Sequence, residues 1–340
     1  MRTKSSNKNL RKASKAKKDE FYTQLSDIEK EIRHYKKHFK KKVVFCNCDD
    51  PRVSNFFHYF SYNFEQLGLQ KLITTCYKNQ NVDLFSQNNS EKAIFLEYTG
   101  DKNKDNVPNP EEIGIKHLQS DGDFRSKECI ELLKQSDIVV TNPPFSLFRE
   151  YVSQLIEHNK KFIIIGNLNA LTYKEIFKLV KENKIWLGQS IHSGDREFGV
   201  PDDYPLTAAS YRIGSDGRKY IRVKGVRWFT NLDYKERHED LILYKTYRGH
   251  ESEYPKYYNY NAINVDKTKD IPMDFAGVMG VPISFLDKYN PAQFEILGMA
   301  SSAGYNEEVV GIPFLGDKDA RPIIKGINTF ARVFIKNRKI

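Results

Sequence analysis

The sequence lacks several features that would place it in a familiar class. Only 4 cysteines occur in 340 residues and none forms a CxxC pair, which argues against a zinc site and against a disulfide framework. No apolar run approaches about eighteen residues, and the basic start of the chain lacks the apolar segment of a secretory signal. We therefore expect reduced thiols, no bound metal, no membrane segment and a soluble, cytoplasmic protein.

The sequence does contain enough apolar material for a packed core, together with an uneven positive charge. Hydrophobic residues make up 39% of the chain, aromatic residues make up 13%, and the formal net charge is +10. Eight lysines and arginines precede the first acidic residue, Asp19, and five more lysines lie between residues 36 and 42. Such a basic arm is either a solvated tail or a segment that neutralises nucleic-acid phosphates, and charge alone leaves both readings open.

Strand and helix patterns alternate along the first 190 residues. Apolar runs that end in polar or turn residues predict strands at 43–51, 71–77, 93–98, 137–141, 161–168 and 184–188. Amphipathic or capped stretches predict helices at 19–39, 52–67, 126–135, 146–159 and 172–182. This alternation indicates an α/β fold with a mainly parallel sheet covered on both faces. Sites in such sheets form at the carboxyl ends of strands, where we expect Asp49, Asp123, Asn142 and Asn167.

Beyond residue 190 the sequence changes character. Residues 192–205 predict a glycine-rich loop, residues 211–223 predict a hairpin that turns at Asp216-Gly217, and residues 226–233 predict a strand. From about residue 245 the chain is aromatic, basic and irregular, which is typical of a specificity lobe. The predicted segments are a basic flexible arm at 1–18, a catalytic domain at 19–240 and a target-recognition region at 241–340.

One turn carries a specific chemical hypothesis. In the stretch IVVTNPPF an apolar strand must stop at Asn142, because the prolines that follow cannot donate to a sheet ladder. The Asn142 side-chain oxygen and the Pro143 carbonyl can accept the two hydrogens of a planar NH2 group, while Pro144 stiffens the turn. Phe145 offers a face on which a flat base can stack. The alternative is that this turn only terminates a strand.

Holding an exocyclic amine in this way favours a tetrahedral nitrogen whose lone pair can attack an electrophile. A methyl sulfonium is the natural electrophile, and the rate gain would come mainly from positioning. A base inside a duplex cannot reach such a clamp, so a nucleic-acid target would have to be flipped out.

Longer strings resemble the EcoRI-type adenine-specific DNA methyltransferases, in the same order along the chain. These strings are DEFYTQ (19–24), CNCDDPRVSNFF (46–57), GDFRS (122–126), SDIVVTNPPFSLF (136–148), TYKEIF (172–177), ENKIWLG (182–188) and INVDKTKDIP (263–272). The resemblance implies a Rossmann-like domain, S-adenosylmethionine as methyl donor with S-adenosylhomocysteine as product, and methylation of adenine N6 in double-stranded DNA. It also implies a bacterial or phage-encoded restriction–modification system with a cognate endonuclease.

The resemblance also assigns residues to the cofactor. It places Tyr22 and Thr23 near the methionine end, Cys48, Asp49 and Asp50 after the first strand, and Asp123 and Phe124 at the adenine, and Asn142 also counts among the cofactor contacts. Two departures stand out. The segment CNCDDPRV contains no glycine, although the wider superfamily has a glycine-rich turn there. The strand KLITTCY lacks the acid that usually binds the ribose, which leaves Tyr77 or Asn79.

Further residues are candidates for contacts with DNA. Phe198, in the predicted loop, is a candidate for the second stacking face, and the aromatic lobe offers Lys256, Tyr257, Lys267 and Lys269. Two alternatives remain open. The same turn serves enzymes that methylate guanine N2 in RNA or glutamine in proteins, and the glycine-free segment also fits a DNA-binding relative without catalysis. The resemblance makes GAATTC a first guess for the recognition sequence, and the oligomeric state cannot be inferred.

Overall fold

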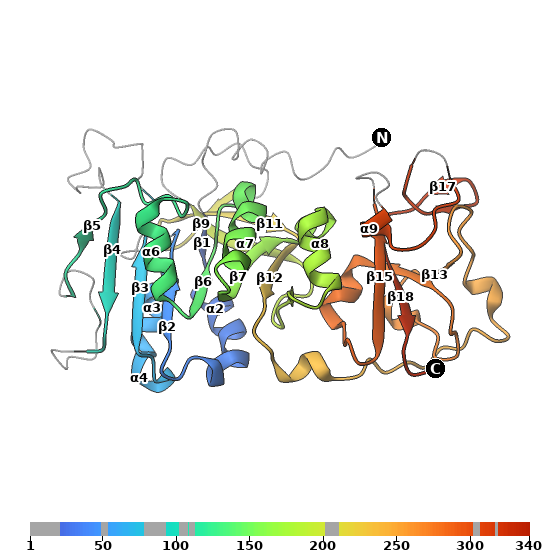
Figure 1. The fold of residues 1–340 in the computed structure, drawn as a ribbon, viewed down its shortest axis with the longest axis horizontal. Helices are drawn as coiled ribbons and strands as arrows, with labels where there is room; N and C mark the ends of the chain where they lie inside the picture. Colours follow the sequence, from blue (N-terminus) through green and yellow to red (C-terminus); the bar gives the residue numbers. More distant parts are fainter. Residues whose placement is uncertain are drawn as a thin grey trace. The chain divides into compact units, whose positions relative to one another are not determined.

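The structure is a computed structural model that describes residues 21–48, 54–77, 93–101, 108, 113–200, 211–301, 307–316 and 319–340. The predicted arm at 1–18 and the candidate residues Asp49, Asp50 and Asn79 lie outside these ranges. The chain forms two compact units (Figure 1). Unit 1 comprises residues 1–168 and 193–232, and unit 2 comprises residues 169–192 and 233–340.

The main sheet of unit 1 has a parallel centre. Its four central strands, in the order β3-β2-β6-β7, run parallel to one another: β2 (Val43–Cys46), β3 (Lys71–Thr75), β6 (Ile138–Thr141) and β7 (Lys161–Asn167). Every residue of β2 and β6 is buried, as expected for parallel strands covered on both faces. The predicted strands are therefore confirmed, with ends that differ by a few residues.

Antiparallel strands flank this parallel centre, so the sheet is mixed rather than parallel throughout. They are β4 (Ile94–Tyr98) and β5 (Lys116–His117) beyond β3, and β12 (Val226–Thr230) beside β7.

Helices cover both faces of the sheet. The helices of unit 1 are α2 (Leu25–Ile32), α3 (Asn55–Tyr62), α4 (Phe64–Leu67), α6 (Lys127–Gln135) and α7 (Phe148–Glu157), with 3-10 turns η1 (Arg33–His38) and η2 (Phe145–Leu147). In β12, Trp228 contacts Phe56 of α3, whereas its neighbour Phe229 contacts Phe148 of α7. Because neighbouring strand residues point to opposite faces, α3 and α7 lie on opposite sides (Figure 1).

The helix predicted at 19–39 begins later than expected. Tyr22–Thr23 instead form strand β1, which pairs antiparallel with Gly199 and Phe198 of β9 (Asp195–Val200). Asn55 Nδ2 also donates to the Thr23 carbonyl at 2.7 Å, which holds this segment extended until α2 begins at Leu25. Tertiary pairing therefore overrides the apolar periodicity that extended back to Phe21.

The segment predicted as a glycine-rich loop contains a strand. β9 joins β1, β10 (Tyr211–Ile213) and β11 (Lys219–Lys224) in a second sheet of unit 1, and the predicted turn at Asp216-Gly217 is confirmed. Phe198 is therefore a buried strand residue, 2% exposed, rather than a loop residue. The strand was not predicted because the glycine and proline residues at the ends of this segment indicated a loop. The alternating pattern between them is short.

Unit 2 is more regular than its sequence indicated. A four-stranded sheet has the order β13-β14-β18-β15 and contains β13 (Ile263–Asn264), β14 (Met279–Pro282), β15 (Phe294–Ala300) and β18 (Arg332–Asn337). Its other elements are α8 (Lys174–Lys181), β8 (Trp186–Leu187), α9 (Glu307–Val310), the hairpin β16 (Ile323–Ile324) and β17 (Ile327–Asn328), and short 3-10 turns. In the part of the chain that the structure describes, no helix is long and apolar enough to cross a membrane.

Candidate active site

The site candidates of unit 1 gather where the strand order changes direction. From β2 the chain passes to β3 on one side, and β6 lies on the other side, so the connections diverge at the carboxyl end of β2. Open α/β sheets bind ligands at such a switch point. Asn47 and Cys48 follow β2, Cys76 follows β3, and Asn142 follows β6.

The Asn142 side chain is buried and oriented. Its Nδ2 atom donates to the Phe21 carbonyl at 2.6 Å, whereas its Oδ1 atom has no hydrogen-bond partner among the described residues. A buried acceptor without a partner loses its hydration without compensation, so such atoms are uncommon in folded proteins. The amide is thus fixed with its oxygen available to a ligand.

Aromatic rings pack around Phe21, whose carbonyl binds this amide. The Phe21 ring lies edge-on to Phe145 with 5.7 Å between centroids, and its centroid is 5.8 Å from that of Phe198. Phe145 itself is only partly buried, so part of its ring can meet a ligand. Phe198 therefore supports the site through Phe21 and is too buried to be the exposed stacking face that the sequence suggested.

Asn47 ties the end of β2 to β6 and α7. The Thr141 hydroxyl donates to the Asn47 carbonyl, and the Tyr151 hydroxyl donates to Asn47 Oδ1. Burial raises the pKa of Tyr151 well above its ordinary value, so this hydroxyl remains a donor. Cys48 follows with φ +85°, a left-handed conformation that is uncommon outside glycine. A cysteine thus takes the left-handed conformation at the end of β2, in a segment whose sequence contains no glycine.

The GDFRS segment lies against the end of β3. Gly122 has φ +78°, and a Cβ atom on it would lie 2.1 Å from the Cys76 carbonyl oxygen and 2.7 Å from the Ala93 Cβ atom. Only glycine permits this approach, which brings Asp123 and Phe124 to the same edge as Asn47. Phe124 is buried and packs edge-on against Tyr151 at 5.0 Å.

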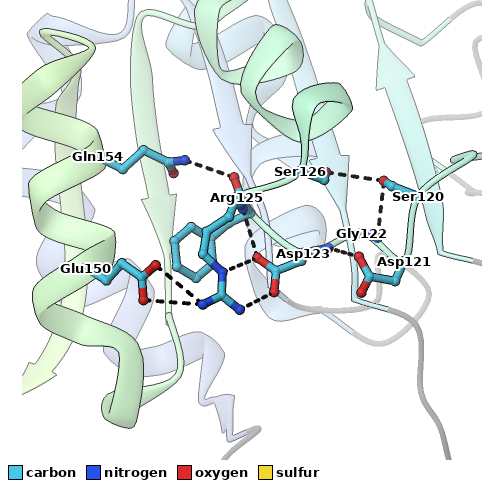
Figure 2. Close-up of polar contacts among 9 residues, drawn as sticks. Ser120, Asp121, Gly122, Asp123, Arg125, Ser126, Glu150 and Gln154 are labelled. Atoms are coloured by element: carbon cyan, nitrogen blue, oxygen red, sulfur yellow. Dashed lines mark hydrogen bonds and ion pairs between the residues drawn. The ribbon is translucent and has the colours of Figure 1, made fainter.

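The Asp123 carboxylate is paired within its own loop (Figure 2). Arg125 donates to it from Nε at 2.8 Å and from Nη2 at 2.5 Å, and Nη1 of the same side chain approaches Glu150 at 3.3 Å. These bonds from Arg125 lower the pKa of Asp123 despite its partial burial. Asp123 is therefore ionised at neutral pH and holds its orientation. With the Arg125 backbone N–H also bound to Oδ1, one lone pair on Oδ2 is left to accept a further bond.

Contacts connect the predicted site residues in two groups. Asn142 of the NPPF turn binds the Phe21 carbonyl, next to half-buried Tyr22 and to Thr23. Phe124, which follows Asp123, packs on Tyr151, and Tyr151 binds Asn47, which precedes Cys48 and accepts from Thr141 beside the turn. The Thr23 hydroxyl is buried and has no partner among the described residues. Sequence reasoning missed Phe21, Asn47 and Tyr151. For Phe21 the sequence signal was the opposite one, because the apolar periodicity of this segment indicated a helix.

The proposed DNA contacts in unit 2 divide into two kinds. Lys256, Lys267 and Lys269 are exposed and remain candidates. The prediction that Tyr257 contacts DNA was wrong. Its side chain is 5% exposed and its hydroxyl donates to Asn264 Oδ1 at 2.8 Å, so it is a core residue. Among the described residues, no group of histidine, cysteine and carboxylate side chains could hold a metal ion.

An amide-bearing turn at the switch point of a mixed sheet is the arrangement expected of an α/β enzyme that acts on a planar amino group. The class is that of the amino-methyltransferases. The chain belongs to the family described as adenine-specific methyltransferase EcoRI, whose pattern matches residues 9–338.

Relatives of this family cover nearly the whole chain. The Type II methyltransferase M.EcoRI of Escherichia coli is 51% identical over 98% of this chain and 98% of its own length. The Type II methyltransferases M.MgeORF184P of Mycoplasma genitalium and M.MpnI of Mycoplasma pneumoniae are 39% and 38% identical over 97% and 96% of this chain. Each is covered over 98% of its own length. No solved structure matches the chain. The protein is thus an adenine-specific methyltransferase.

Proposed function

We propose that the protein methylates N6 of a flipped-out adenine at one specific sequence in duplex DNA, with S-adenosylmethionine as the donor. The observation that carries this proposal is the Asn142 amide, whose Nδ2 atom is engaged by Phe21 and whose buried Oδ1 atom lacks a partner among the described residues. An exocyclic NH2 group supplies the donor that this oxygen needs. The adenine specificity of the family disfavours guanine N2 and protein glutamine as acceptors.

The turn would accept hydrogen bonds from both hydrogens of the adenine amine. Asn142 Oδ1 accepts one hydrogen and the Pro143 carbonyl accepts the other, so the nitrogen lone pair becomes directed rather than delocalised into the ring. Phe145 stacks on the base, and the surrounding Phe21 and Phe198 rings exclude water from the amine. The chain's contribution is therefore orientation and desolvation of the nucleophile.

The residues at the edge of the sheet fit the donor. When bound, S-adenosylmethionine supplies an activated methyl group. Two observations support a binding site here: the close approach of Gly122 to Cys76, which holds the Asp123 loop at the end of β3, and the buried Thr23 hydroxyl, which has no partner in the described part of the chain. Thr23 and Tyr22 would hold the methionine end, Cys48 would line the centre, and Asp123 would accept from the adenine amine beside Phe124. Asp49 and Asp50 remain candidates that lie outside the described residues.

Replacing Asp123 with alanine should weaken S-adenosylmethionine binding by about ten- to a hundredfold, the usual effect of losing a charge-assisted hydrogen bond. Because Arg125 keeps the pKa of Asp123 below its ordinary value, the carboxylate is ionised throughout the neutral range. The affinity of the native protein for S-adenosylmethionine should therefore show no pH dependence from Asp123 between about pH 5.5 and 8. Titration calorimetry at both pH values measures the affinity. Lys134→Ala, in an exposed ion pair with Glu131, is the control, and equal affinities in both variants would remove Asp123 from the site.

The DNA-binding role is assigned to basic and aromatic segments outside the turn. The region 241–340, with Lys256, Lys267 and Lys269 exposed, is proposed as the part that recognises the target sequence. The context is a bacterial or phage-encoded restriction–modification system, in which cytoplasmic methylation protects host DNA from a cognate endonuclease without requiring contact between the two enzymes. GAATTC is the first sequence to test.

Deleting residues 1–18 should flatten the salt dependence of DNA affinity. Removing one protein–phosphate contact reduces the slope of log K against log salt by about 0.9. The eight cationic side chains of this arm would supply such contacts. Fluorescence-anisotropy titrations across a series of salt concentrations give the slope for both chains. An unchanged slope would mean that the arm is a passive tail.

The acceptor is tested by offering three substrates to the purified protein with S-adenosylmethionine that carries a labelled methyl group. Label should enter duplex DNA and should not enter structured RNA or a protein carrying the glutamine motif. Sequencing the DNA of an expressing host for N6-methyladenine then identifies the modified base and its sequence together. Label in RNA or protein alone would overturn the proposal.

A further inference from the structure

A groove of about 790 Å³ lies in unit 1, between α2 with η1 on one side and α3 with α4 on the other. Helices α2 and α3 are in contact with each other. One wall carries Lys30, Arg33 and Lys36, and the other wall carries His58 and Tyr62. No described residue of the candidate active site lines the groove, so it is a separate feature of the same unit.

The first wall presents a row of cations. Lys30, Arg33 and Lys36 are exposed and lie three residues apart, across the end of α2 and the start of η1. Residues at this spacing share one side of a helix, with about 4.5 Å of rise per step in an α-helix and about 6 Å in a 3-10 helix. None of the three forms an ion pair with a described residue, and Glu29 is the one acidic side chain in the described lining. This wall therefore has a net positive charge, with three cations against one carboxylate.

The second wall presents aromatic rings. His58 and Tyr62 lie one turn apart on α3 with 6.3 Å between ring centroids, and Tyr62 is 56% exposed. Burial, followed by the nearby Arg218, lowers the pKa of His58, so its ring is uncharged at neutral pH. Cations bind phosphates and aromatic rings pack on sugars or bases, so the two walls together suit a sugar–phosphate chain. Because the row of cations spans about 10 Å, a single small anion could not meet all three of them.

The groove begins beside the segment that orients the catalytic amide. Asn55 lines the groove and donates from Nδ2 to the Thr23 carbonyl at 2.7 Å. Two residues earlier, the Phe21 carbonyl accepts from Asn142 at 2.6 Å. From the start of α2, the helical rise places Lys36 about 20 Å away, which is the length of about six base-pair steps of duplex DNA. All of these residues belong to unit 1.

We propose that this groove binds the sugar–phosphate backbone of the duplex that flanks the target adenine, with Lys30, Arg33 and Lys36 each on one phosphate. This inference rests on the proposed function, because it needs DNA whose target base lies at the Asn142 turn. Phosphate contacts carry no sequence information, so the groove would fix the position of the duplex on unit 1 while other residues read the sequence. The contacts require flanking DNA that extends about six base pairs from the target.

The test measures the salt dependence of affinity for two duplexes that carry the methylated site, by fluorescence anisotropy. One duplex ends about four base pairs from the target adenine on each side and the other about fifteen, so only the longer one reaches the whole row of cations. Lys30→Gln, Arg33→Gln and Lys36→Gln, combined in one variant, remove three phosphate contacts and keep residues that favour a helix. On the longer duplex the slope of log K against log salt should fall by about 2.7. On the shorter duplex the fall should be at most about half as large, because that duplex ends before Lys36.

A matched variant separates the groove from the net charge of the chain. Lys37→Gln, Lys40→Gln and Lys41→Gln, combined, remove the same charge from the same basic run, but these exposed side chains do not line the groove. This control should leave the slope nearly unchanged on both duplexes. The exchange Lys30→Arg, Arg33→Lys and Lys36→Arg keeps every charge and should retain the native slope.

Three results would overturn the proposal: a native slope in the glutamine variant of the groove, an equal fall on the two duplexes, or an equal fall in the control variant. Methyl transfer by the native protein distinguishes this failure from that of the proposed function. A native protein that methylates neither duplex refutes the proposed function. A native protein that methylates the longer duplex, beside a groove variant with a native slope, refutes the groove alone.

Discussion

Replacing Asn142 with alanine should lower the rate of methyl transfer by at least about a thousandfold and leave duplex binding nearly unchanged. Alanine removes the Oδ1 acceptor, whereas Pro143 and Pro144 keep the course of the turn. Single-turnover transfer of a labelled methyl group measures the rate, and a gel-shift titration measures binding. Robust turnover by this variant would falsify the catalytic assignment.

Asn142→Asp provides the sharper control because it keeps the shape and one acceptor oxygen. Its second oxygen would replace the Nδ2 atom that donates to the Phe21 carbonyl at 2.6 Å, so two acceptors would face each other. This contact and burial both raise the pKa of the new carboxyl group, since each disfavours its charged form. The protonated acid can donate to Phe21, and activity should therefore rise as the pH falls through the raised pKa. A variant rate without pH dependence would contradict the role of the Phe21 carbonyl.

Gly122→Ala should destabilise unit 1 and abolish tight S-adenosylmethionine binding. The added Cβ atom would lie 2.1 Å from the Cys76 carbonyl oxygen, and the residue has φ +78°, so the loop must move away from the end of β3. Clash and backbone strain together should cost about 3 kcal/mol or more in the free energy of unfolding. Denaturant unfolding measures the stability, and calorimetry measures the cofactor affinity.

Gly217→Ala is the matched control for this clash. Gly217 also lies in unit 1 and has φ +76°, but a Cβ atom there would have nothing within 4 Å. Its substitution should cost only the backbone strain, about 1–2 kcal/mol, and should leave cofactor affinity unchanged. Equal losses in both variants would show that the approach of Gly122 to Cys76 is not needed.

Local sequence was a good guide to the elements of unit 1. Ser54 and Ser126 begin α3 and α6 as side-chain caps, and Gly68 ends α4 in the left-handed conformation, so those helix ends follow from residues next to them. The turn at Asn142 was predicted for the same reason, because proline acts on its immediate neighbours. The failures occurred where distant pairing decides, as at β1 and β9.

The position of Tyr257 shows the same limit in unit 2. Its neighbours in sequence are polar, basic or exposed, and the pattern of apolar residues does not predict that its ring is buried. The ring is buried because β14 and β18 pack beside it, and its contacts with Gly280 and Phe334 come from residues far along the chain. Burial of an aromatic side chain in an irregular segment is therefore a tertiary property.

By itself, the sequence determined the alternating strands and helices, the stiff NPPF turn and the acidic GDFRS loop, since each depends on residues close together in the chain. Only the tertiary structure decided that the Phe21 carbonyl orients the Asn142 amide across 121 residues and that Asn47 joins Tyr151. Short-range preferences restrict φ and ψ one residue at a time. The choice of partners between remote segments depends instead on burying their combined apolar surface and satisfying their polar atoms, which is a property of the whole folded unit.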